Sequence, residues 1–303
     1  MLSANPVVFF DNRNVLDANF LRILASAKID NDIIVIVTSP NHKPLKTKNN
    51  VSIVDAYSLP GYREFENKFL GVYQHLSTNT QEFETSCFLR FFAAECLIKK
   101  MQLERIWMFD CDVWPTNSIS FWNDARSDYL SPDYFDERTI SCHSSLLSSA
   151  LLRQFNKFTL EVFYNEMIPE LQELFEQIKS DQLSGGISDM TAMGFFLRNY
   201  SNYPWLDSNI NGYSEHFLSH TFSRLYLDLN KTGKSYVLIV RARKNFFVIS
   251  GLKYRRYATL HFQGNAKHLI PVIQRFRFLW GNQKLFSIMI RVSRKCQKIF
   301  SSK

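Results

Sequence analysis

Short apolar runs and helix-spaced apolar positions alternate along the first part of the chain. Residues 6–10 and 33–37 are continuous apolar runs that end at polar or proline-containing segments, a pattern typical of buried strands. Residues 51–54 predict a third strand. Apolar positions recur at helical spacing after Asp17, which predicts a helix capped by that side chain. Strands that alternate with helices predict βαβ units and a largely parallel sheet.

The pattern is strongest in the middle of the chain. Residues 87–98 have a helix pattern, and residues 105–109 form an apolar run that predicts a buried strand. That strand stops at the triplet that begins with Asp110 and ends with Asp112. Because ligands bind at the carboxyl ends of strands in parallel α/β sheets, both carboxylates are predicted to lie where chemistry can occur.

The same patterns predict the remaining elements. These are a mainly helical segment at 145–180, a Gly-rich turn at 184–190, a helix at 191–199, a loop at 200–235 and short strands at 236–240, 246–249 and 257–262. We therefore predict an α/β fold with a Rossmann-type, mostly parallel sheet flanked by helices over residues 1–270. Residues 271–303 are predicted to form a basic helical extension.

Composition narrows the class of protein. With 46% hydrophobic and 15% aromatic residues among 303, the chain is not disordered. It has no apolar run of about 18 residues, so we expect no transmembrane helix. The first residues lack the basic region and cleavage site of a signal peptide. The five cysteines are scattered, without the CxxC spacing, which predicts a reduced, cytoplasmic chain without a zinc knuckle.

Charge is distributed unevenly along the chain. Residues 229–303 contain 17 Lys or Arg and no acid, whereas residues 1–228 hold the other 19 basic residues and all 28 acidic ones. The C-terminal part is therefore expected to face phosphate groups, acidic lipid or nucleic acid. Residues 272–300 interleave basic with aromatic and aliphatic side chains. This pattern fits an interfacial membrane helix, which we favour, and also a packing helix with a solvated basic face.

Two groups of residues could carry chemistry. As the chain turns into a loop, Asp110 and Asp112 can reach one Mn²⁺ or Mg²⁺, ions that favour carboxylate and phosphate oxygens. The alternative is a solvated loop with two acids. In the last predicted strand, His261 can complete such a metal shell. In the segment that follows, Gly264 allows close approach to a phosphate, and Lys267 adds a positive charge.

Together, the Asp-x-Asp and His-x-x-Gly-x-x-Lys motifs resemble glycosyltransferases of the GT-A fold, particularly those of family 8. The resemblance covers residues 5–270 in outline. It implies that Asp110, Asp112 and His261 bind manganese, and that Gly264 and Lys267 face the diphosphate of a nucleotide sugar, with a UDP-sugar favoured. Asp110 could instead contact the ribose.

Further roles follow from the same resemblance. Arg90, in a context similar to the family's Tyr-x-Arg, is implied to contact the donor. Where the family often has Asp-Gln, this chain has Asp189 followed by Met190. Donor choice and the retaining or inverting course therefore stay open.

Two further polar sites, Asp189 and the loop of residues 11–13, have both a structural and a functional interpretation. Asp189 is either a helix cap or a catalytic carboxylate beside the sugar, where it would accept a proton or stabilise positive charge. If Ser188 is the cap, Asp189 is free for catalysis. The loop residues Asp11, Asn12 and Arg13 are placed to contact the base or ribose, although such loops are often only solvated.

The sequence thus predicts a metal-dependent glycosyltransferase. We expect it to act on a glycan or lipid-linked acceptor, as in polysaccharide biosynthesis, in the cytoplasm and peripherally on the inner face of a membrane. A phosphatase of the haloacid dehalogenase type ranks second, because its nucleophile also lies in an Asp-x-Asp after an apolar strand. A nucleic-acid-binding protein ranks third, because it would leave Asp110 and Asp112 unexplained.

Overall fold

A computed structural model gives the fold of this 303-residue chain. It describes residues 5–13, 16–26, 32–39, 51–115, 139–140, 142–183 and 185–199, the strands within 219–222, 237–242, 245–250, 253–256 and 259–262, and also Lys267 and Ile270.

The largest sheet has five strands, in the order β3–β2–β1–β4–β6. They are β1 (Val7–Asp11), β2 (Ile33–Val37), β3 (Val51–Asp55), β4 (Arg105–Phe109) and β6 (Ser144–Ser148). The first four are parallel, and β6 is antiparallel to β4. Because β2 and β4 lie on opposite sides of β1, the strand order changes direction between β1 and β4. Sheets of this kind bind ligands at the carboxyl ends of the two strands at such a point.

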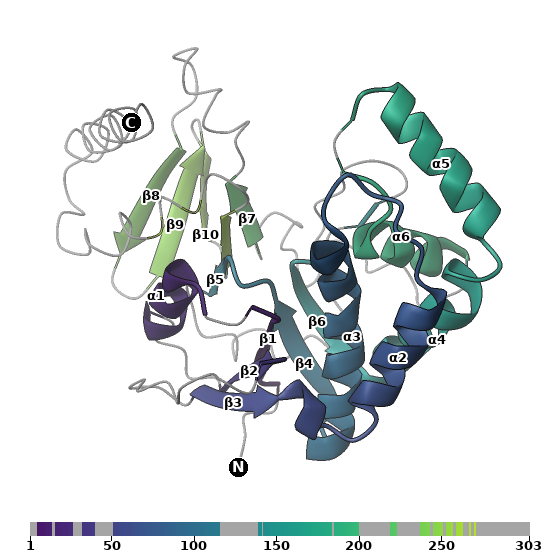
Figure 1. Cartoon of the computed structure of the whole chain (residues 1–303). Helices are drawn as coiled ribbons and strands as arrows, with labels where there is room; N and C mark the ends of the chain where they lie inside the picture. The colour runs from purple at the N-terminus through teal and green to yellow at the C-terminus, as the bar shows by residue number, and fades with distance from the viewer. Residues whose placement is uncertain are drawn as a thin grey trace, which may run out of the picture.

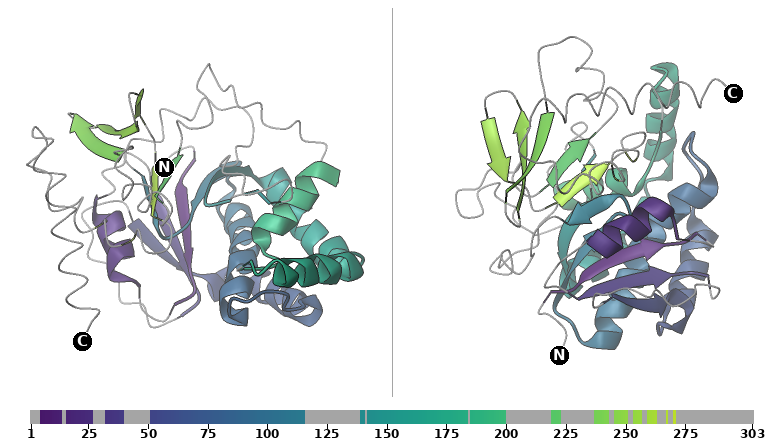
Figure 2. Two further views of the ribbon diagram at one scale, coloured as in Figure 1. Left: turned by 90° about the horizontal axis from the view of Figure 1, so that it is seen from above. Right: turned by 90° about the vertical axis from the view of Figure 1, so that its left-hand side faces the viewer.

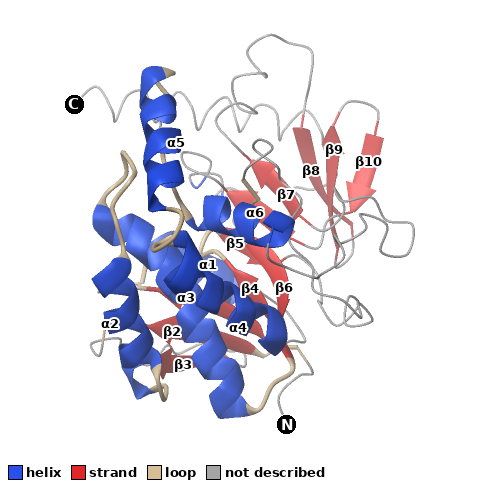
Figure 3. Ribbon diagram, turned by 90° about the vertical axis from the view of Figure 1, so that its right-hand side faces the viewer, coloured by secondary structure: helices blue, strands red, loops and turns tan. Residues whose placement is uncertain are grey.

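Helices cover both faces of this sheet (Figure 1). Helix α1 (Ala18–Ser26) lies on one face, and α3 (Gln81–Met101) crosses the other. The other helical elements are η1 (Ala56–Ser58), α2 (Tyr62–Val72), α4 (Ser149–Phe158), the π-helical η3 (Thr159–Phe163), α5 (Ile168–Ser180) and α6 (Asp189–Asn199). Figure 3 shows α2, α3 and α4 side by side on the α3 face. None of the helices in the described part of the chain is both long and apolar enough to cross a membrane.

The two faces of the sheet bury different side chains because successive strand residues point to opposite sides. Val8, Ile34 and Met108 pack toward α3 in the larger apolar cluster. Phe9 and Phe109 point the other way and pack with residues of α1. Apart from Asp11 and Arg105 at strand ends, the central strands β1, β2 and β4 therefore carry apolar residues throughout, as expected for strands covered on both faces.

Two small sheets complete the described structure (Figure 2). In the first, β11 (Thr259–Phe262) lies between β5 (Val113–Pro115), to which it is antiparallel, and β7 (Ser219–Phe222), to which it is parallel. The second is an antiparallel sheet of β8 (Val237–Ala242), β9 (Asn245–Ser250) and β10 (Lys253–Arg256). Through β5, the first small sheet joins residue 261 to the end of β4.

The predicted fold class is confirmed: a mostly parallel sheet flanked by helices. Three details of the prediction were wrong. Residues 145–148, expected at the start of the helical segment at 145–180, belong to the edge strand β6. The expected loop at 200–235 contains β7, and β10 was not predicted. The predicted extension at 271–303 lies outside the described residues, so the domain boundary at residue 270 stays a prediction.

Candidate metal and donor site

The two aspartates of the Asp-x-Asp motif lie in a tight turn between β4 and β5. The backbone N–H of Val113 donates to the carbonyl of Asp110 over 2.9 Å, which closes the turn. Between the aspartates, the Cys111 thiol donates to the carbonyl of Phe10 over 3.3 Å and links the turn to β1. The turn lets the two carboxylates approach one common position, as the sequence analysis predicted.

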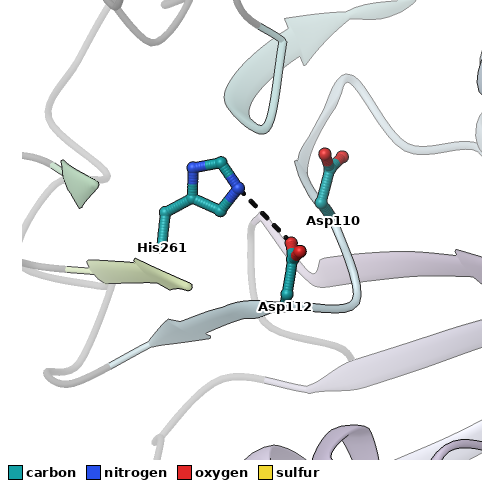
Figure 4. Close-up of side chains that lie close together, drawn as sticks. All are labelled: Asp110, Asp112 and His261. Carbon is teal, nitrogen blue, oxygen red and sulfur yellow. Dashed lines mark ion pairs between the residues drawn. The ribbon is translucent and has the colours of Figure 1, made fainter. Parts of the chain in front are cut away.

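His261 reaches the same turn from β11 (Figure 4). Its neighbour in the ladder is Val113 of β5, so it stands beside Asp112. The Nε2 atom of His261 lies 3.4 Å from Oδ1 of Asp112, and Nζ of Lys267 lies 3.0 Å from Oδ2 of the same carboxylate. Burial acts to raise the pKa of Asp112. Hydrogen bonding from His261 and the charges of His261 and Lys267 outweigh burial and hold that pKa below its usual range.

These side chains fit a divalent cation. Asp110, Asp112 and His261 each offer one ligand atom, and the three atoms lie within 4.8 Å of one another. Two carboxylate oxygens and one imidazole nitrogen form a donor set suited to Mn²⁺, and carboxylate oxygens also suit Mg²⁺. The three predicted metal ligands are therefore brought together. Gly264 lies outside the described residues.

Arg90 connects this cluster to a third carboxylate. From α3, its Nη1 donates to Asp110 and its Nη2 to Asp189, while its side chain is only 11% exposed. Burial acts to lower the pKa of Arg90, but the two carboxylates outweigh it and raise that pKa, so the guanidinium stays charged. The structure thus places Arg90 between Asp110 and Asp189, and its contact with a donor diphosphate stays a prediction.

Asp189 is the first residue of α6, and its side chain is 5% exposed. Its carboxylate bonds Arg90, which favours a role in the site over a capping role. Burial raises the pKa of Asp189 to about 6 against the opposing charge of Arg90, and the charge of Asp110 adds to the rise. A carboxyl with such a pKa exchanges protons near neutral pH.

The loop after β1 lies next to the turn of the Asp-x-Asp motif. Nε of Arg13 donates to Oδ1 of Asp11 over 2.7 Å, and Nη2 donates to Oδ2 over 2.6 Å. The carboxylate of Asp11 is buried, and Arg13 occupies both of its oxygens. Asn12 and the outer part of Arg13 are exposed. These two, rather than Asp11, are the groups that can face a ligand here.

The sequence analysis did not identify His143, which lies against the metal ligands. Its ring stacks on that of His261, with 4.0 Å between ring centroids and 19° between ring planes. Its carbonyl accepts a hydrogen bond of 3.0 Å from the N–H of Asp110. Burial lowers the pKa of His143 well below its usual value. Only recognition of β6 as the neighbour of β4 could have placed His143 beside Asp110.

Fold and site together define a class: an α/β protein with an Asp–Asp–His group that could hold a cation at the carboxyl end of its sheet. No protein-family model and no curated protein sequence matches the chain. Among solved structures, it is similar to mouse xyloside xylosyltransferase 1 in its apo form, with 11% identity, 76% of this chain and 91% of that chain covered, and a TM-score of 0.44.

A second similar structure is the galactosyltransferase LgtC in complex with donor and acceptor sugar analogues. It shows 12% identity over 89% of this chain and 95% of that one, with a TM-score of 0.42. A third is the PaToxG glycosyltransferase, with 11% identity over 65% of this chain and 70% of that one, and a TM-score of 0.37. All three similarities are distant, so we base the functional proposal on the geometry of the site.

Proposed function

We propose that this protein is a metal-dependent glycosyltransferase that moves a sugar from a nucleoside diphosphate to a hydroxyl acceptor. The observation that carries the proposal is the convergence of Asp110, Asp112 and His261 at the carboxyl end of β4. Lys267 pairs with Asp112 of this group, and Arg90 pairs with Asp110. Carboxylates that bind a divalent metal ion, with the charged side chains of Lys267 and Arg90 beside them, suit a ligand with several phosphate oxygens.

The ligand would lie across the point between β1 and β4 where the strand order changes direction. Asp110, Asp112 and His261 would hold Mn²⁺ or Mg²⁺. When bound, the ion supplies positive charge to the departing diphosphate. Lys267 is 47% exposed, so its ammonium can turn from Asp112 toward a phosphate oxygen. Asn12 and Arg13 would contact the base or ribose.

Arg90 and Asp189 would act at the sugar. Arg90 holds the Asp189 carboxylate in a buried position beside Asp110. With a pKa of about 6, Asp189 can take a proton from the acceptor hydroxyl in an inverting reaction. It can instead stabilise the positive charge that develops on the sugar in a retaining one. More specifically, we propose a reaction of the family 8 type that uses Mn²⁺ and a UDP-sugar donor. We propose that the acceptor is a glycan or a lipid-linked sugar, as in polysaccharide biosynthesis.

Calorimetric titration of the full-length protein with UDP and with GDP tests the proposal. We expect one nucleotide to bind in Mn²⁺ and not in EDTA, and Asp112→Asn to weaken this binding at least about tenfold. Glu64→Gln is the matched control, because it neutralises an exposed carboxylate on α2, away from the site. If the wild type binds no nucleoside diphosphate in either condition, the transferase proposal is wrong, and phosphate monoesters become the next substrates to test.

A further inference from the structure

His143 lies at the junction of two sheets. It directly precedes β6, whose ladder pairs Ser144 with Phe109 of β4. This register places the carbonyl of His143 opposite the backbone N–H of Asp110, and the two are hydrogen-bonded over 3.0 Å. The main chain of His143 therefore helps to fix the start of the turn that carries the two aspartates.

The side chain of His143 contacts another candidate metal-binding residue, His261. Its imidazole lies face to face with that of His261, with 4.0 Å between ring centroids and 19° between planes. Both residues are buried, His143 at 3% and His261 at 7% exposure. Through its carbonyl and its ring, His143 thus touches two of the three candidate ligands: Asp110 in the turn after β4, and His261 in β11.

A flat group against one face of an imidazole limits rotation of the ring about its Cβ–Cγ bond. That rotation is otherwise soft, and it decides whether Nε2 of His261 points toward Asp112. A ligand whose orientation is fixed before the ion arrives loses less conformational freedom on binding, and this raises affinity. The stacked ring has the position needed to fix His261 in this way.

We propose that His143 is a positioning residue for the metal site, which holds the His261 ring in its ligating orientation by stacking. The inference rests on the proposed metal site and is independent of the sugar chemistry. His143 is not part of the ligand group, because the described side chains whose ligand atoms lie within 4.8 Å of one another are Asp110, Asp112 and His261. It therefore acts through His261.

A double-mutant cycle with Mn²⁺ alone tests this proposal. The free Mn²⁺ signal in electron paramagnetic resonance gives the dissociation constant for the wild type, His143→Ala, His261→Ala and the double variant. In the otherwise wild-type protein, we expect His143→Ala to weaken Mn²⁺ binding about tenfold, at the low end of the effects seen for residues that orient a metal ligand. In the His261→Ala background the same change should have less than a twofold effect, because the ring it positions is gone.

The matched control is His75→Ala, which removes a histidine outside the site that contacts the Tyr73 hydroxyl. It should leave Mn²⁺ affinity unchanged. Electron spin-echo modulation from a Mn²⁺-bound nitrogen gives a second readout. At saturating Mn²⁺ it should persist in His143→Ala and disappear in His261→Ala. If His143→Ala does not fold, His143→Asn takes its place in both measurements.

Three results would overturn the proposal. One is an equal loss of affinity from the His143 change in both backgrounds, which would mean that it acts independently of His261. Another is a nitrogen signal that survives in His261→Ala and disappears in the His143 variant, which would make His143 the ligand. The third is a wild type that does not bind Mn²⁺. Mn²⁺ binding without any nucleotide binding would contradict the proposed transferase and leave the role of His143 intact.

Discussion

Arg90 is a buried cation that bonds two carboxylates from distant parts of the chain, Asp110 and Asp189. Replacing it by Met would keep a side chain of similar length and leave these carboxylates without their shared partner. Loss of one member of a buried ion pair costs about 3–5 kcal/mol. Because Asp110 is partly exposed, we expect Arg90→Met to lower the free energy of unfolding by about 3 kcal/mol, measured by urea denaturation.

The control is Arg22→Met, in an exposed arginine of α1 whose contact is with Asn19 of the same helix. It should change stability by less than about 0.5 kcal/mol. Equal losses in the two variants would show that Arg90 contributes no more than an ordinary surface arginine.

Asp189 gives the fold a specific dependence on pH. Its pKa is raised from 3.8 to about 6 by burial, so between these values the folded state holds a proton that the unfolded state has lost. Stability from this group is therefore complete below about pH 4 and falls as the pH rises through about 6. Relative to Asp189→Asn, which does not titrate, the wild type should lose up to about 3 kcal/mol over this range. Denaturation curves at half-unit pH intervals measure this difference, and parallel pH profiles would contradict it.

Single residues also show how far the sequence could predict the site. Asp110 and Asp112 were singled out because they follow a strong apolar run, and His261 and Lys267 because they form a His-x-x-Gly-x-x-Lys motif at the end of the last predicted strand. His143 was missed because its contacts with Asp110 and His261 depend on the pairing of β6 with β4. The ion pairs of Arg90 with two carboxylates were not foreseen for the same reason, since they join helix α3 to two other elements.

At the scale of elements, two segments pair closely and lead into Asp189. Residues 76–78 bond residues 185–187: Ile187 N–H donates to the Leu76 carbonyl over 2.8 Å, and Gly185 N–H to the Thr78 hydroxyl over 2.9 Å. Ser77 Oγ donates in turn to the buried carboxylate of Glu84 in α3 over 2.8 Å. The pairing ties the approach to α6, and hence Asp189, to the start of α3.

Gly186 is where this pairing is tightest. A Cβ there would meet the carbonyl oxygen of Leu76 and lie 2.5 Å from Cα of Ser77, both backbone atoms that cannot rotate away. We expect Gly186→Ala to lower stability by about 1–3 kcal/mol. If the transferase proposal holds, sugar transfer should also fall, because Asp189 would shift. Thermal unfolding and the transfer rate measure these effects.

Gly71→Ala is the comparison for Gly186. Gly71 lies in α2 with nothing within 4 Å of an added Cβ, so alanine should raise stability by up to about 1 kcal/mol. A Gly186→Ala variant as stable as the wild type would mean that the paired segments separate without cost.

The sequence predicted elements well where one physical signal dominated. β2 consists entirely of buried β-branched residues and was predicted with its observed bounds. β6 was missed because it has the sequence Ser-Ser-Leu-Leu-Ser, with no β-branched residue and no alternation, and becomes a strand through its pairing with β4. Hydrophobic pattern specifies elements covered on both faces, whereas edge strands depend more on tertiary context.

At the scale of the whole molecule, the site is assembled from segments that are distant in sequence. The turn between β4 and β5 supplies the aspartates, α3 supplies Arg90, α6 supplies Asp189, and β11 brings His261 back to β5. The sequence allowed the parallel sheet to be predicted, and hence the place where ligands bind. It could not show that the small sheet of β5, β11 and β7 joins that place, because β5 and β11 are short and far apart in the sequence.

The charge of the whole chain leads to the last prediction. The 17 basic residues of 229–303, without a single acid, lie mainly outside the described residues, and we expect them to bind an anionic membrane surface. Each basic residue near such a surface contributes about 1 kcal/mol, and salt screens the attraction. The full-length protein should therefore cosediment with vesicles of phosphatidylserine and phosphatidylcholine. It should cosediment less with the same vesicles at about 0.5 M salt, and not with vesicles of phosphatidylcholine alone.

Two variants with the same loss of charge make this test specific. The first changes four tail residues to Gln: Arg275, Arg277, Arg291 and Arg294. The second changes four exposed residues elsewhere to Gln: Arg22, Lys68, Lys99 and Lys157. A membrane-binding tail predicts at least about a tenfold loss of vesicle affinity in the first and little change in the second. Equal losses would instead mean that net charge alone attracts the protein, because the position of the positive charge would then not matter.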